Sequence, residues 1–114
     1  MLSSSGRFHG YSSLNWAYRH GENIRDQQVS LKYALNSRRH SFRAAVVVSR
    51  KVNRSAVVRN RIRRRIYEIV RAHEADIKGS FDLIFIVQKD EVVSLPNEEL
   101  SAMITNLMKR AKVI

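Results

Sequence analysis

The stretch SAVVRNRIRRRIYEIVR, residues 55–71, holds six arginines among mainly apolar residues. A guanidinium carries a fixed positive charge and a planar fork of N–H donors that fits the oxygens of a phosphate. Between Arg50 and Arg65 the chain has eight cations and no acid, although like charges on a helix cost about 0.2–0.5 kcal/mol per neighbouring pair. A solvated helix face normally mixes signs. The run therefore predicts the binding of a polyanion.

The net charge of +11 is concentrated in one third of the chain. Residues 38–71 contain twelve Lys or Arg and one acid, and the rest of the chain is neutral. Among polyanions, nucleic acid is favoured over a membrane, because the apolar stripe of the arginine segment is Val and Ile rather than the aromatic or Leu-rich face of a lipid-binding helix. No apolar run approaches the roughly 18 residues of a membrane span. We predict a nucleic-acid partner and no membrane association.

Catalytic patterns are missing from the sequence. The four histidines are scattered without an HExxH motif, the four glycines are too far apart for a phosphate loop, and there is no cysteine for thiolate metal sites or disulfides. We therefore predict no catalytic residue and no metal ligand on this chain. The lack of cysteine also fits a reducing compartment, so we expect a cytoplasmic protein.

A chain of 114 residues suits one domain. We expect residues 1–10 to be a loose N-terminal tail and residues 11–114 to form a single RNA-binding α/β domain. Ser55 is a good N-cap for a helix through the arginine run. At 100° per residue, Asn60, Arg61 and Arg64 point away from the apolar stripe. The stripe consists of Val58, Ile62, Ile66, Ile69 and Val70.

The remaining pattern supplies strands and two further helices. Alternation predicts a half-buried strand over Val29–Leu35, and continuous apolar residues predict a central strand over Phe42–Val48 and another over Phe81–Val87. Leu14–His20 reads as a short helix ended by Gly21, and a last helix starts near Pro96. A helix-turn-helix is disfavoured, because a strand rather than a helix precedes the arginine helix.

The run VSRKVNRSAVVRNRIRRRIYEIVR, Val48–Arg71, resembles the signature of the bacterial ribonuclease P protein subunit. That signature is a strand ending in V-S-[KR]-K, a short loop, and a helix with R-N-R-[IV]-[KR]-R. The matching residues are Val48–Lys51 and Arg59–Arg64. The loop here lacks the glycine of many members, and Leu14 and Tyr18 stand where many members have two phenylalanines.

The resemblance implies an α+β fold, an α–β sandwich of a mixed four-stranded sheet and three helices, with a left-handed crossover at the arginine-rich helix. It also implies an accessory subunit of an endoribonuclease, a hydrolase whose chemistry lies on a catalytic RNA using Mg²⁺ that the RNA mainly binds. The reaction would remove the 5′ leader of precursor tRNA.

Residue roles follow from the resemblance together with the charge pattern. The residues expected to contact the catalytic RNA are Arg50, Lys51, Arg54, Arg59, Asn60, Arg61, Arg63, Arg64 and Arg65. Those expected to line the cleft for the unpaired leader are Leu14, Tyr18, Lys32, Phe42, Arg43 and Val47. Flat rings and cations can hold unpaired nucleotides without reading much sequence.

Two alternatives stay open at this point. A ribosomal or general RNA-binding protein could carry a similar basic helix and have no role in cleavage. A protein nuclease acting alone would need a carboxylate or histidine cluster, which the sequence does not offer.

Overall fold

The computed structural model describes residues 21–36 and 41–114. The tail predicted for residues 1–10 and the helix predicted over Leu14–His20 lie outside this part. The described elements are β1 (Glu22–Arg25), β2 (Val29–Leu35), β3 (Arg43–Val47), α2 (Ala56–Ala72), η2 (Glu74–Asp76), β4 (Phe81–Val87), η3 (Asp90–Val93) and α3 (Asn97–Arg110), where η marks a 3₁₀ helix.

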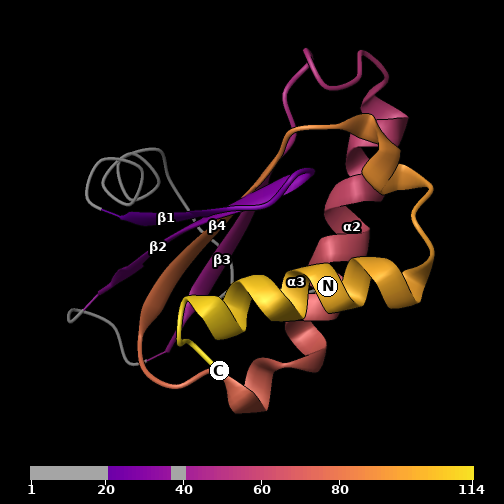
Figure 1. The fold of residues 1–114 in the computed structure, drawn as a ribbon. Coiled ribbons are helices and arrows are strands. Elements are labelled where there is room, and N and C mark those ends of the chain that lie inside the picture. Colours follow the sequence, from indigo (N-terminus) through magenta and orange to yellow (C-terminus); the bar gives the residue numbers. More distant parts are fainter. Residues whose placement is uncertain (1–20, 37–40) are drawn as a thin grey trace.

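The four strands form one mixed sheet in the order β1-β2-β4-β3 (Figure 1). Strand β2 is antiparallel to β1 and β4, whereas β3 is parallel to β4. The predicted α+β class and mixed four-stranded sheet are confirmed. Of the three predicted helices, the described part contains two α-helices, together with two 3₁₀ turns.

Strand β3 lies at an edge of the sheet, so the prediction of a central strand over Phe42–Val48 is wrong. Its apolar character has another cause, which is that α2 packs against it. The hydroxyl of Tyr67 on α2 also accepts a hydrogen bond from the Val46 amide at 3.2 Å. Helix α2 therefore covers β3 and occupies one of its backbone donors.

One face of the sheet and two helices enclose the core. Because strand side chains alternate, Leu31, Phe85 and Val46 point to the same face, and all three are buried. Helix α2 packs against β3 and α3, while α3 packs against β1 and β2. The helical residues with no exposed surface in this core are Ile62, Ile66, Val70, Leu100, Ile104, Leu107 and Met108.

Strand β1 is short and polar, and a side-chain contact helps to hold it. The Tyr33 hydroxyl donates to the Glu22 carboxylate at 2.8 Å, and these two residues are cross-strand partners. This hydrogen bond, followed by burial and the negative charge of Glu22, raises the pKa of Tyr33 above its ordinary value.

Helix α2 starts where the sequence predicts. The Ser55 hydroxyl accepts a hydrogen bond from the Val58 amide at 3.3 Å, as expected of an N-cap. The helix ends at Ala72, with His73 as C-cap. It joins the parallel neighbours β3 and β4 and therefore forms a crossover, whose left-handed sense stays a prediction. Over the residues that the structure describes, no helix is long and apolar enough to cross a membrane.

Candidate RNA-binding surface

The outer face of α2 presents cations to solvent. Asn60, Arg61 and Arg64 are exposed, as the helical period predicts, while the opposite side of the helix is buried. Within residues 21–36 and 41–114, neither Arg61 nor Arg64 makes a hydrogen bond or an ion pair. Val57 lies on the same outer face with 69% of its surface exposed. These arginines keep their donors available for an external anion.

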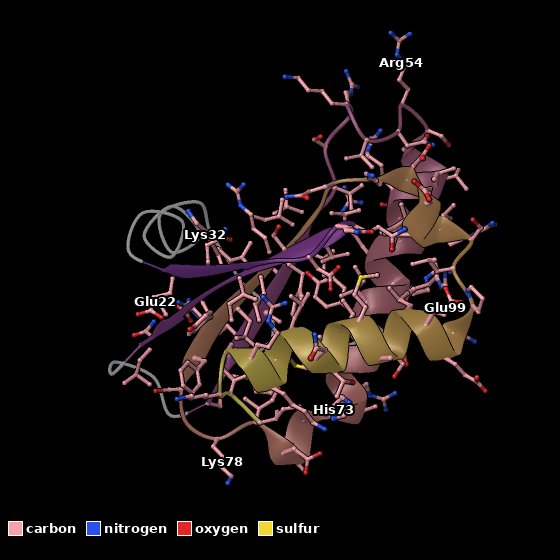
Figure 2. All side chains as sticks on the ribbon, in the orientation of Figure 1. Glu22, Lys32, Arg54, His73, Lys78 and Glu99 are labelled. Atoms are coloured by element: carbon pink, nitrogen blue, oxygen red, sulfur yellow. The ribbon has the colours of Figure 1, made fainter. Side chains whose placement is uncertain are left out.

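The loop before α2 extends this surface. Arg50, Lys51 and Arg54 are exposed, and Figure 2 shows Arg54 pointing into solvent beyond the N-terminal end of α2. None of these three side chains has a carboxylate partner in the part of the chain that is described. Together with Arg61 and Arg64 they make a set of five exposed cations, which we call the outward cation set.

Three arginines of the run instead bind groups of this chain. Arg63 donates to the Asn60 side chain at 2.5 Å. Arg59 donates from Nη1 to the carbonyl oxygens of Asn53 and Arg54 at 3.0 and 2.9 Å. These contacts leave fewer donors for RNA than the sequence-based assignment assumed.

Of these three arginines, Arg65 makes the most hydrogen bonds to other groups of the chain. Its Nη1 donates to the carbonyl oxygens of Val92 and Val93 at 2.7 and 2.9 Å. Its Nη2 donates to the carbonyl oxygen of Leu95 and to Asn97 Oδ1, the latter at 3.0 Å. The RNA contact of Arg65 stays a prediction, but in this structure its fork donates to backbone carbonyls of η3 and of Leu95, which precedes α3. Helical period alone could not reveal this, since the acceptors are about thirty residues away in sequence.

We expect Arg65→Ala to lower the free energy of unfolding by roughly 2 kcal/mol, because it removes charged hydrogen bonds to four acceptors at a partly exposed site. Urea denaturation measures the change. The matched control is Arg64→Ala, which removes the adjacent exposed arginine and should change stability by less than about 0.5 kcal/mol. Equal effects of the two substitutions would contradict the assignment of Arg65 as an internal anchor.

The residues predicted for the leader cleft do not all share one surface. Cross-strand register places Lys32, Ala45 and Ile84 in one row, so Lys32, Arg43 and Val47 lie on the face opposite α2 and α3. Val47 is half-buried and Lys32 partly exposed. Leu14 and Tyr18 fall outside the described residues.

Phe42 and Arg43 stay predictions as leader contacts, but the structure buries both side chains. Phe42 precedes Arg43 by one residue, so strand alternation turns its ring to the opposite face, where it is 6% exposed in the core. Arg43 is itself buried and donates to both carboxylate oxygens of Asp82, at 2.9 and 2.8 Å. Lys32 and Val47 are the more exposed of the predicted leader contacts among the described residues.

No group of three or more His, Asp or Glu residues in the described ranges could hold a metal ion. The surface can neutralise and orient phosphates. Sequence reasoning missed Asn53, which stands just before the helix cap and ties the basic loop to η3 through a 3.3 Å hydrogen bond to Asp90.

Comparisons with known proteins agree with this picture. A family model described as Ribonuclease P matches residues 3–112. The chain is 36% identical over 97 residues to the ribonuclease P protein component of Brevibacillus brevis, covering 85% of this chain and 75% of that one. It is 31% identical over 115 residues to the ribonuclease P protein component of a Pseudanabaena species, covering 100% and 97%.

Solved structures share the fold. The RNase P protein from Staphylococcus aureus superposes with a TM-score of 0.84 at 25% identity, over 95% of this chain and 96% of that one. The RNase P protein from Thermotoga maritima superposes with a TM-score of 0.80 at 22% identity, over 91% and 96%. Since the family match spans nearly the whole chain and relatives above 30% identity cover most of it, this chain belongs to the ribonuclease P protein family.

Proposed function

We propose that this chain is the protein subunit of a bacterial-type ribonuclease P. It binds the catalytic RNA through the outward cation set and helps that RNA to remove the 5′ leader from precursor tRNA, which gives the mature tRNA 5′ end. The observation that carries the proposal is that Arg61 and Arg64 are exposed and have no partner among the residues that the structure describes. Family membership supports the choice of RNA as the polyanion.

The protein's part in the reaction is electrostatic. Docking precursor tRNA on the catalytic RNA brings two polyanions together, and fixed cations between them reduce the repulsion of their phosphates. Lysine and arginine cannot ligate Mg²⁺, which prefers oxygen ligands. In the proposed reaction Mg²⁺ would be held mainly by oxygen ligands of the RNA and would supply the hydrolytic chemistry there, as the family resemblance implies.

The sheet face opposite the helices is the proposed seat of the unpaired leader. Lys32 supplies a cation and Val47 an apolar contact on that face. Leu14 and Tyr18 remain proposed contacts on grounds of resemblance alone. A shallow surface of this composition grips a single strand through its backbone and bases with little sequence preference. The proposed cellular compartment of this activity is the cytoplasm.

The test is single-turnover cleavage of a precursor tRNA with a 5′ leader. The comparison uses this protein alone, a bacterial ribonuclease P RNA alone at low Mg²⁺, and the two together. We expect cleavage only, or much faster, in the mixture and none with protein alone. Tight RNA binding without stimulation would favour a general RNA-binding protein, and cleavage by the protein alone would place the chemistry on this chain.

A further inference from the structure

The basic loop between β3 and α2 is tied down at several points. The amides of Val52 and Asn53 donate to the Ser49 carbonyl at 3.1 and 3.4 Å. Asn53 Oδ1 accepts from the Ser55 amide at 2.8 Å, while its Nδ2 donates to Asp90 on η3. A loop that only displayed charge would not need these bonds, since exposed cations attract phosphates from any loop conformation.

Arg59 adds two hydrogen bonds in which the donor is charged, the stronger kind of hydrogen bond. Its Nη1 reaches back from the first turn of α2 to the carbonyl oxygens of Asn53 and Arg54, at 3.0 and 2.9 Å. These bonds hold the Arg59 charge next to a loop that already carries Arg50, Lys51 and Arg54. The hydrogen bonds must therefore outweigh the repulsion between these like charges. The two carbonyls fix the peptide planes on either side of Arg54, and so fix the direction in which the loop leads into the helix.

We propose that Arg59 is a positioning residue, which holds the loop so that Arg50, Lys51 and Arg54 meet RNA phosphates in one preset arrangement. This inference rests on the proposed function. Side chains and loops that are ordered before association lose less conformational freedom on binding, so affinity rises without any new contact. Arg59 thus acts on RNA through the loop, whereas Arg61 and Arg64 act directly.

A double-mutant cycle separates these two modes of action. Arg59→Lys keeps the charge but replaces a guanidinium fork with a flexible ammonium that cannot reproduce the geometry of the two bonds. It is made in the wild-type chain and in a chain with Arg50→Ala, Lys51→Ala and Arg54→Ala. Affinity for the ribonuclease P RNA is measured for all four proteins at one salt concentration. Arg61→Lys, on the same helix but with no internal bond, is the matched control in both backgrounds.

We expect Arg59→Lys to weaken RNA binding roughly fivefold to tenfold in the wild-type chain and to have almost no effect in the triple-alanine chain. Arg61→Lys should have the same effect in both backgrounds. An equal loss from Arg59→Lys in both backgrounds would overturn the proposal, because it would mean that Arg59 contacts RNA itself.

A second readout does not depend on RNA. Amide hydrogen exchange of Val52 and Asn53 should accelerate in Arg59→Lys and stay unchanged in Arg61→Lys. Of these two arginines, only Arg59 donates hydrogen bonds to the loop. Unchanged exchange in both variants would also overturn the positioning role. If the wild-type chain failed to bind ribonuclease P RNA at all, the proposed function would fail first, and the exchange result would still report whether Arg59 orders the loop.

Discussion

Replacing Asp82 with alanine is expected to lower the free energy of unfolding by about 3–5 kcal/mol, because it leaves the Arg43 guanidinium buried without its bidentate partner. Asp82 has no exposed surface and the Arg43 side chain is 9% exposed. Asn36 donates to the same carboxylate at 3.1 Å, and this hydrogen bond would be lost as well. Stabilities of natural domains are about 5–15 kcal/mol, so this loss is a large fraction of the total. Thermal and urea unfolding measure the loss.

Two controls make the Asp82 result specific. Asp76→Ala removes an exposed carboxylate 3.5 Å from His73 and should cost less than about 0.5 kcal/mol. The double substitution Arg43→Met with Asp82→Leu replaces the pair by apolar groups and should recover most of the stability. A folded Asp82→Ala variant of wild-type stability would show that the pair contributes little.

The buried pair also changes how a functional defect at Arg43 should be interpreted. Loss of cleavage in Arg43→Ala would look like a lost RNA contact, as the sequence suggested. Asp82→Ala removes a negative charge, so simple electrostatics would predict tighter RNA binding. A loss of activity in both variants would therefore indicate unfolding.

Replacing Arg61 and Arg64 together with alanine is expected to weaken binding to ribonuclease P RNA by about 100-fold or more. Each charged hydrogen bond to phosphate is worth about 1.5–3 kcal/mol, and 1.4 kcal/mol is tenfold in affinity. The logarithm of the affinity should also fall less steeply with the logarithm of salt, by about 0.7–0.9 per contact removed. The melting temperature should hardly change, since both side chains are exposed and unpaired in the described part of the chain.

The charge-matched control is Lys78→Ala with Lys109→Ala. Both lysines are exposed, and Figure 2 shows Lys78 at the opposite end of the molecule from Arg54. This pair removes the same charge and should reduce affinity and salt dependence far less. Equal losses from the two double variants would mean that net charge matters and the outer face of α2 does not. Loss of folding in the Arg61 and Arg64 variant would mean that the helix face was misassigned.

Local signals in the sequence were sufficient for the main elements. The bounds of β2 and β4 agree with the predicted strands, since alternation and apolar runs are short-range properties. Helix α2 begins after the predicted N-cap Ser55, and Ile62, Ile66 and Val70 of the predicted apolar stripe are fully buried. The outward direction of Arg61 and Arg64 followed from the same period.

What the sequence missed depends on distant pairing. Strand β1 is four mostly polar residues that pair with β2 and carry little pattern of their own. The edge position of β3 is set by its pairing partner, and a partner cannot be deduced from a strand's own composition. Arg59, Arg61 and Arg65 are alike by residue type, yet two of them bind backbone carbonyls and one is free, which only the folded neighbours decide.

The hydrogen bond from Val46 to Tyr67 has a consequence for self-association. An edge strand with free donors can template another chain, and β3 is an Ala- and Val-rich edge of this sheet. Tyr67 on α2 occupies one of those donors, while the arginines on the outer side of the helix repel other copies of the protein. Neutralisation by RNA removes the repulsion but leaves the tyrosine in place. The same helix therefore opposes aggregation in two ways, and one of them persists when the charge is masked.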